Sequence, residues 1–252
     1  MTRAGARRVK RFKRILAFDV GGTGLKAAII DGQGKLLSEH LRVPTPHPST
    51  PKTLVKSLVA LAAPLGKFDC ISIGFPGVVR GSHVITAPNL GTVLWAGYDL
   101  AGTLSKKLDG KPAKLVNDAD MQGLAIVKGK GLEFVITLGT GFGTALFRDG
   151  ELMPHMELAH MPVENGKDFD EYIGEKALKK IGRKRWNKRI AKILPYFHTL
   201  LHYDHLYIGG GNAHKLDIDL PPKASKVSNI AGLKGGAALW RKSGREHLTA
   251  RS

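Results

Sequence analysis

The stretch that decides the fold is FDVGGTGLKAAIIDGQGK, at residues 18–35. Within it, residues 22–27 fit G-x-G-x-x-A, a pattern of loops that hold a dinucleotide pyrophosphate at the start of a helix. Such a loop must open a helix and be followed about 20 residues later by an acidic residue. Here a second apolar run follows the loop, and residues 40–45 read HLRVPT, without an acid. The stretch therefore predicts strand, glycine turn and strand, and it argues against a dinucleotide site.

Length and composition describe a globular chain with many turns. The 252 residues include 31 glycines and are 42% hydrophobic, which allows a sizeable core. No run approaches the roughly 18 apolar residues that span a bilayer, and the N-terminus lacks the apolar region of a secretory signal. The single cysteine, Cys70, allows no internal disulfide and no cysteine zinc cluster. A cytoplasmic protein is expected.

The net charge of +18 comes from two clusters. Residues 1–14 hold 7 basic residues and residues 176–192 hold 9, in both cases without an acid. The remaining 23 basic and 21 acidic residues nearly balance. Such clusters indicate either a polyanionic partner or simply a well-solvated surface, and charge alone does not separate the two.

Outward from the opening stretch, strands and helices alternate. Apolar runs predict strands at 15–20, 25–31 and 35–43, then at 70–77 and 113–118, with helices at 52–65 and 98–110. Residues 133–152 repeat the opening pattern of strand, glycine turn and strand. Helical sequence follows from about 169 to 203, with Gly182 as a break and Pro195 as a kink or boundary, and then a strand at 205.

Two halves with the same opening predict a duplicated α/β architecture with a cleft between two domains. The expected division is a basic tail at 1–13, a smaller N-terminal domain at 14–116 and a larger C-terminal domain at 117–230. A closing helix at about 231–243 is expected to return to the first domain.

Three glycine clusters follow apolar strands. Glycine lets backbone N–H groups approach an anion, and the hydroxyls of Thr23 and Thr140 and the ammonium of Lys26 add donors. For each cluster alone, a tight hairpin is the better explanation, but three clusters at strand ends favour phosphate binding. No G-x-x-x-x-G-K-[ST] pattern occurs, which excludes a P-loop enzyme. The clusters are Gly21, Gly22, Gly24; Gly139, Gly141, Gly143; and Gly209, Gly210, Gly211.

Phosphoryl transfer to an alcohol also needs a carboxylate that accepts the hydroxyl proton. Asp118 follows the strand AKLVN, at the strand end where ligands collect in α/β sheets. Its neighbour Asn117 offers the donor and acceptor that a sugar hydroxyl requires. The alternative is that Asp118 only caps the helix beginning at ADMQGLA.

From about residue 15 to residue 240, the motifs and their order resemble those of the ROK family (repressors, open reading frames and kinases). DVGGTGLK and LGTGFG resemble its two phosphate loops, GFPGVV and TAPNLG its sugar-binding turns, NDAD its catalytic motif, ELAH its E-x-G-H sugar motif and IGGGNA its nucleoside-side glycines. The resemblance implies an actin-like, ribonuclease H-like fold and a homodimer.

The resemblance also implies roles. Asp118 is expected to take the proton from the C6 hydroxyl of glucose, and Asp19 to help place Mg²⁺, through water if not directly. The residues expected to bind the sugar are Gly77, Asn89, Asn117, Glu157 and His160. Without the motif order, Asn89 reads as an ordinary turn residue, and Glu157 with His160 as an i,i+3 pair on a surface helix.

Two departures from the family pattern stand out. No cysteine follows His160, so no zinc is expected, and Ala159 replaces a glycine of the sugar motif. The extra glycine in GGTGLK and the missing cysteines resemble the polyphosphate glucokinase branch, which uses polyphosphate and ATP as donors. The basic residues of the second cluster are then expected to bind polyphosphate, which releases counterions as nucleic acids do. They include Lys180, Arg183, Lys184, Arg185 and Lys188.

Three rival functions stay open. One is an ATP-only kinase for mannose or an N-acetylhexosamine. The second is a DNA-binding regulator of the same family, although about 14 residues before the first loop are too few for a helix-turn-helix domain. The third is a sugar-binding protein without catalysis, which would be expected to lack Asp118.

Overall fold

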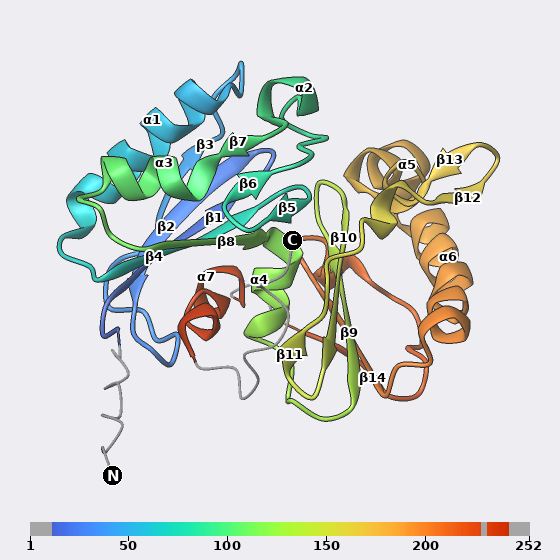
Figure 1. The fold of residues 1–252 in the computed structure, drawn as a ribbon. Helices are drawn as coiled ribbons and strands as arrows, with labels where there is room; N and C mark the ends of the chain where they lie inside the picture. The colour runs from blue at the N-terminus through green and yellow to red at the C-terminus, as the bar shows by residue number, and fades with distance from the viewer. Residues whose placement is uncertain (1–11, 228–230, 242–252) are drawn as a thin grey trace, which may run out of the picture.

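The computed structural model describes residues 12–227 and 231–241, so most of the basic tail lies outside the described residues. Within them, the chain folds around two five-stranded sheets (Figure 1). No helix of this described part is long and apolar enough to cross a membrane.

The first sheet has the order β3-β2-β1-β4-β8. β1 pairs antiparallel with β2, and β2 with β3, whereas β1, β4 and β8 are parallel. The apolar runs of β1 and β4, inside the sheet, are buried, as expected for strands covered on both faces. The bounds are β1 Ile15–Val20, β2 Gly24–Ile30, β3 Leu41–Pro44, β4 Cys70–Phe75 and β8 Ala113–Asn117.

Helices α1 (Pro51–Ala62), with the short 3₁₀ turn Ala63–Leu65, and α3 (Leu100–Lys107) pack on one face of this sheet (Figure 1). The side chain of Thr50 caps α1, and Pro51 follows it at the first helical position, where a missing N–H costs nothing. The apolar residues of α1 then recur with helical spacing on the buried face.

The second sheet repeats the first, with the order β11-β10-β9-β14-β15. β10 pairs antiparallel with both β9 and β11, whereas β9, β14 and β15 are parallel. The duplicated architecture predicted from the two glycine turns is confirmed. The bounds are β9 Leu132–Leu138, β10 Phe142–Arg148, β11 Glu151–Leu152, β14 His205–Gly209 and β15 Ala224–Lys226.

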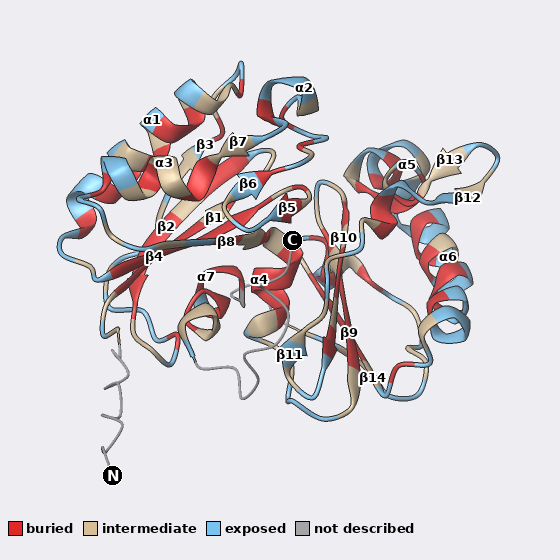
Figure 2. Ribbon diagram, viewed as in Figure 1, coloured by how far each residue is buried: buried red, intermediate tan, exposed pale blue. Residues whose placement is uncertain are grey.

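One face of the second sheet is covered by α5 (Phe169–Ile173) and the long α6 (Glu175–Leu201). Trp186 of α6 is fully buried and donates a hydrogen bond to the carbonyl of Ile173. Figure 2 shows most of the buried residues on the inner strands of the two sheets and on α4, whereas the outer face of α6 is exposed. The predicted break at Gly182 is confirmed, because its φ is 77°. Pro195, in contrast, lies inside the helix.

Helix α4 (Asp118–Leu124) lies between the two sheets and packs against strands of both (Figure 1). On the side of the first sheet, a side chain at Gly74 would contact Met121, and one at Gly235 would collide with the backbone of Met121. On the other side, a side chain at Gly123 would contact the ring of Phe147. Glycines on both sides therefore allow α4 to approach both sheets closely.

The closing segment is shorter than predicted. Helix α7 (Ala231–Gly235) and a 3₁₀ turn at Ala238–Trp240 replace the helix expected at about 231–243, and residues 242–243 lie outside the described part. Helix α7 packs against β1, β2 and α4. The division of the chain into 14–116 and 117–230 stays a prediction.

The third strand also differs from the prediction. It begins at Leu41 instead of residue 35. The hydroxyl of Ser38 accepts the hydrogen bond from the backbone N–H of Ile29, which replaces a ladder bond there, and Leu37 is 42% exposed. The apolar residues before Leu41 therefore predicted a strand that the structure does not have there.

Smaller elements surround the sheets. The bounds of β5, β6 and β7, which form a three-stranded sheet, are Val79–Arg80, His83–Val84 and Tyr98–Asp99, those of the hairpin β12 and β13 are Pro162–Glu164 and Lys167–Asp168, and α2 is Thr92–Trp95. Short 3₁₀ turns lie at Leu158–His160 and Ala213–Lys215.

Candidate active site

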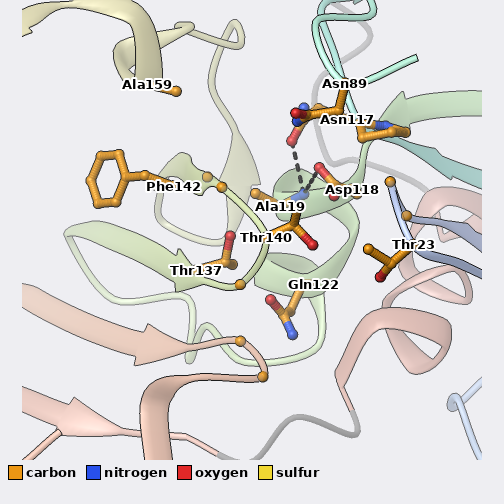
Figure 3. Close-up of a pocket in the computed structure, with 18 of the residues that line it drawn as sticks. Thr23, Asn89, Asn117, Asp118, Ala119, Gln122, Thr137, Thr140, Phe142 and Ala159 are labelled. Atoms are coloured by element: carbon orange, nitrogen blue, oxygen red, sulfur yellow. Dashed lines mark hydrogen bonds between the residues drawn. The ribbon is translucent and has the colours of Figure 1, made fainter. Parts of the chain in front are cut away.

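A cleft of about 350 Å³ lies where the two sheets meet α4 (Figure 3). Both glycine hairpins, the end of β8 and the loop after β14 line it. Most of the predicted site residues come together here. They are Asp19, Gly21, Gly22, Thr23, Gly24, Lys26, Gly77, Asn89, Asn117, Asp118, Gly139, Thr140, Gly141, Glu157, His160, Gly210 and Gly211.

The first glycine loop turns tightly and is held from behind. The N–H of Gly21 donates to the carbonyl of Gly24 across the turn. The hydroxyl of Thr45, which is buried, donates to the carbonyl of Gly21 at 2.6 Å, and its backbone N–H donates to Thr23. These bonds use carbonyls of the loop and leave the N–H groups of Gly22 and Thr23 without a backbone partner inside the described protein. Such N–H groups can bind an anion.

The third loop needs glycine for close approach, and the first loop lies beside the second. Gly210 has a φ of 89°, and a side chain there would collide with the backbone of Leu138. A Cβ on Gly22 would lie 3.4 Å from the Cβ of Asn89 and 3.9 Å from Thr140, which belongs to the second loop. The two hairpins therefore approach the same region of the cleft from opposite sides.

Asp118 is the first residue of α4, but it is not the helix cap. Asn117 provides the cap, because its Oδ1 accepts from the backbone N–H of Ala119 at 2.8 Å and of Asp120 at 3.4 Å. The amide nitrogen of Asn117 donates to the carbonyl of Gly77 at 3.1 Å. Asn117 is thus largely occupied by internal bonds. The capping alternative for Asp118 is wrong, and its carboxylate lines the cleft between Asn89 and Thr23 (Figure 3).

The surroundings of Asp118 suit proton transfer near neutral pH. Burial and, after it, the negative charge of Asp19 raise the pKa of Asp118, the N–H of Ala119 partly opposes them, and the net pKa is about 7. A general base is most effective when its pKa lies near the working pH. A cleft carboxyl with such a shift is a candidate for acid–base chemistry.

Asp19 and Lys26 form an ion pair in the cleft, on the strands that flank the first glycine loop. They are opposite each other on β1 and β2, and Lys26 Nζ lies 2.8 Å from Asp19 Oδ2. In the part of the chain that the structure describes, no group of three or more His, Cys, Asp or Glu side chains is placed to hold a metal ion. Mg²⁺ commonly needs only one or two carboxylates, since phosphates and water complete its shell, so Asp19 fits such an ion.

Glu157 and His160 lie at the other end, around the 3₁₀ turn at Leu158–His160 rather than on a surface helix. His160 Nδ1 lies 2.9 Å from Asp168 Oδ2, and Ala159 lines the cleft as well. Although burial opposes it, the hydrogen bond to Asp168 and the neighbouring acids raise the pKa of His160. This end presents a carboxylate and an imidazole to the cleft.

His155 is a residue that the sequence did not single out. Its buried ring bridges two parts of the site, with Nδ1 3.1 Å from Asp120 Oδ1 on α4 and Nε2 3.8 Å from Glu157 Oε2. Burial lowers the pKa of His155, but the hydrogen bond to Asp120 and the negative charges of Asp120 and Glu157 outweigh it and raise the pKa to about 9. A charged His155 therefore ties the carboxylate of Glu157 to the helix that begins with Asp118.

Other residues that line the cleft were also missed. Asp170 accepts a hydrogen bond from the N–H of Phe142, and Asn212 donates to the carbonyl of Gly139 at 3.0 Å. Asn212 directly follows the third glycine cluster, and this position was an available signal. Asp170 lies in a segment in which the sequence shows no recognisable motif. Arg42, Gln122, Thr137 and Glu175 line the cleft as well.

A few predicted residues are not among those that line the cleft. Gly209 is buried at the end of β14, and the basic residues of α6 lie on its exposed side. Glu175, at the start of α6, reaches the cleft instead. Arg183 connects α6 to the region after the third glycine cluster, because its Nε donates to the carbonyl of Lys215 at 2.8 Å. The predicted basic residues that do not line the cleft are Lys180, Arg183, Lys184, Arg185 and Lys188.

Comparisons with known proteins agree with this geometry. A polyphosphate glucokinase of Mycobacterium tuberculosis (strain CDC 1551 / Oshkosh) is 31% identical over 235 residues, which cover 87% of this chain and 88% of that protein. The crystal structure of an inorganic polyphosphate/ATP-glucomannokinase from Arthrobacter sp. strain KM superimposes with a TM-score of 0.81 at 29% identity, covering 90% of this chain and 98% of that one.

The fold extends to more distant structures. A ROK family glucokinase from Streptomyces griseus, solved with glucose and AMPPNP, shares it with a TM-score of 0.73 at 20% identity, over 90% of this chain and 98% of the other. This likeness shows the actin-like fold alone. Residues 15–174 match the ROK family profile, from β1 through the last residue before α6. The chain belongs to the ROK family.

Proposed function

We propose that this protein is a glucokinase that transfers a phosphoryl group from inorganic polyphosphate or ATP to the 6-hydroxyl of glucose. The observation that carries the proposal is the placement of Asp118. Its carboxylate lines the cleft between two glycine hairpins, and its pKa is raised to about 7. The Mycobacterium polyphosphate glucokinase and the Arthrobacter polyphosphate/ATP-glucomannokinase to which this chain is similar support the same donor and acceptor.

In the proposed reaction, the carboxylate of Asp118 accepts the proton of the sugar hydroxyl. The hydroxyl oxygen then forms a bond to the terminal phosphorus of the donor, and the bond from that phosphorus to its bridging oxygen breaks. The shortened polyphosphate, or ADP, leaves with the negative charge. N–H groups of the loops at Gly21–Gly24 and Gly139–Gly141 hold the phosphate oxygens.

The sugar is held at the opposite end by hydrogen-bonding groups. Glu157 and His160 bind hydroxyls by charge-assisted bonds, and Asn89 lies where its amide can contribute. Asn117 contributes mainly by fixing α4, because both ends of its amide already have protein partners. Asp19 would hold Mg²⁺ together with the donor phosphates, and the ion would neutralise charge on the phosphoryl group.

The test is hexose phosphorylation by the purified protein, with polyphosphate and ATP as separate donors. Glucose is expected to be phosphorylated with at least one donor, and Asp118→Asn to abolish most of the turnover. Mannose and an N-acetylhexosamine belong in the same panel, since the Arthrobacter relative is a glucomannokinase. Failure of every hexose with both donors would refute the proposal, and turnover with ATP alone would remove polyphosphate from it.

We also propose that the basic residues of α6 bind the outer part of a polyphosphate chain. Support comes from their number and exposure, and from the contact of Arg183 with Lys215, near the third glycine cluster. Replacing Lys184 and Lys188 together by Ala is expected to raise the KM for polyphosphate and to weaken its salt dependence. An unchanged KM for polyphosphate would contradict this role.

Assembly as a homodimer, location in the cytoplasm and a role in glycolysis complete the proposal. Tyr196 and Leu200 are 47% and 58% exposed near the end of α6, so this end is where a second copy would bury apolar surface. Sedimentation of wild-type protein and of a Leu200→Glu variant tests this. A wild-type monomer across the micromolar range would refute the dimer.

A further inference from the structure

The cleft is strongly acidic for a site that takes a polyanion. Two Lys or Arg side chains line it in the described part of the chain, Lys26 and Arg42. Lys26 is already paired with Asp19 at 2.8 Å. Arg42 forms no ion pair and no side-chain hydrogen bond with any described residue. Five carboxylates line the cleft, those of Asp19, Asp118, Glu157, Asp170 and Glu175.

Strand register places Arg42 at the phosphate end of the cleft. Arg42 on β3 is opposite Lys26 on β2, and Lys26 is opposite Asp19 on β1. Residues that are directly opposite share one face of a sheet. On β4 the same row continues with Gly74, which packs against Met121 and lies beside the Cα of Asp118 at the start of α4. The row therefore runs from two cations to the carboxylate of Asp19 and on to the residue that begins α4.

The guanidinium of Arg42 lies over the first glycine loop. A Cβ placed on Gly24 would be 3.1 Å from Arg42 Nε and 3.4 Å from one of its terminal nitrogens. Because Gly24 lacks a side chain, the guanidinium can lie against the loop in which the N–H groups of Gly22 and Thr23 have no backbone partner among the described residues. The planar fork of an arginine matches two phosphate oxygens, which a single ammonium cannot do.

We propose that Arg42 binds the donor's phosphate chain beside the first glycine loop, as a subsite for the phosphate units behind the one transferred. The inference rests on the proposed function and deepens it. A nucleotide offers only two such units before its sugar, whereas polyphosphate continues past the site. Arg42 therefore contributes more to the use of polyphosphate than to the use of ATP.

A solvated surface arginine is the plain alternative, since Arg42 is exposed. Arg80 is a matched control, because it is also an exposed arginine on a strand of the same half and does not line the cleft. The variants to compare are Arg42→Gln, Arg42→Lys and Arg80→Gln. Arg42→Lys keeps the charge and removes the fork.

The experiment measures kcat/KM with polyphosphate and with ATP, KM for glucose, and binding of inorganic tripolyphosphate by calorimetry at several salt concentrations. Loss of one charge-assisted contact is expected to lower kcat/KM for polyphosphate about 10-fold in Arg42→Gln. The loss with ATP is expected to be smaller, KM for glucose unchanged, and Arg42→Lys intermediate. The slope of log affinity against log salt should fall by about one in Arg42→Gln.

The outcomes separate the inference from the function. If wild-type protein phosphorylates hexoses and Arg42→Gln behaves like Arg80→Gln with polyphosphate, the subsite is refuted while the kinase stands. Equal losses with polyphosphate and ATP refute the preference for the longer chain. If no hexose is phosphorylated, the proposed function fails, and tripolyphosphate binding alone decides whether Arg42 binds a phosphate chain.

Discussion

The two glycine hairpins, β1–β2 and β9–β10, occupy the same place in their sheets but carry different chemistry. In the first, Asp19 is opposite Lys26, one step below the loop. In the second, the corresponding pair is Thr137 opposite Gly143. A duplicated scaffold therefore holds an ion pair in one copy and a hydroxyl with a glycine in the other.

The difference shows how the site divides its tasks. A side chain at Gly143 would collide with Thr137 and reach 3.0 Å from the Cβ of Ala119, so the second hairpin serves as a packing surface for α4. The first hairpin instead places the charge of Asp19 near Asp118, where it helps to raise the pKa of Asp118. One hairpin thus fixes the position of Asp118 and the other tunes its acidity.

The largest effect is expected from Asp118→Asn, which removes the proton acceptor between the hairpins. Because general-base catalysis contributes about 10²- to 10⁴-fold, kcat should fall by that factor, while KM for glucose changes little. Steady-state kinetics with both donors measures it. A variant with kcat within a factor of three of wild type would exclude Asp118 as the base.

The stability of the same variant provides a control for folding. In the wild type, the folded state keeps a proton on Asp118 up to about pH 7, whereas the unfolded chain loses it near the ordinary carboxyl pKa. The contribution of Asp118 to the free energy of unfolding therefore falls as pH rises from about 4 to 7. Asp118→Asn should lack this decline. Denaturant titrations across the window test it, and an unchanged pH dependence would contradict the raised pKa.

Helix α4 is also tied to the two halves in different ways. Glycine and methionine contacts hold it to the first sheet, whereas the buried His155–Asp120 pair holds it to the segment after the second hairpin. His155→Asn leaves the carboxylate of Asp120 buried without its partner and should lower the free energy of unfolding by about 3 to 5 kcal/mol. The exposed counterpart, His160→Asn, should cost under about 1 kcal/mol.

Two further measurements separate the ion pair from simple packing. Asp120→Asn in the His155→Asn background should restore part of the lost stability, because it removes the unpaired charge. The raised pKa of His155 stabilises the fold fully below the unfolded value of about 6.5, and this stabilisation is lost as pH rises through about 9. A difference from wild type that stays constant from pH 6 to 10 would rule out the charged pair.

The sequence predicted the hairpins and the position of Asp118 because these features are local. Apolar runs followed by glycines mark a strand end within a few residues, and a carboxylate directly after such a run lies at the same edge. Arg42 and His155 could not be found in this way. Arg42 reaches the site through its pairing with β2, and His155 through a contact across 35 residues with Asp120. At Ser38 the sequence instead predicted too much. The apolar pattern favoured a strand there, but the Ser38 hydroxyl accepts the hydrogen bond of Ile29 that a strand backbone would otherwise take.

Asp19→Thr makes the first hairpin resemble the second at this position and tests the division of tasks directly. Loss of a group that helps place the metal should lower kcat/KM about 10- to 100-fold. Removal of the negative charge of Asp19 should also lower the pKa of Asp118, so kcat/KM should reach its plateau at lower pH than in the wild type. A pH profile with an unshifted midpoint would show that the first hairpin does not tune Asp118.

The smallest effect, and the sharpest contrast, is expected from adding one methyl group to each hairpin. In Gly143→Ala the methyl meets Thr137 and Ala119 in a packed interior, and overpacking of this kind costs about 1 to 3 kcal/mol of stability. In Gly24→Ala the methyl meets the end of the Arg42 side chain, which can move, so stability should change by less than about 0.5 kcal/mol. Thermal unfolding of both variants measures the difference in stability. Their kcat/KM for polyphosphate should change in the opposite order, with the larger loss in Gly24→Ala, because only this variant displaces Arg42. Equal losses of stability would mean that the second hairpin has no special role in seating α4.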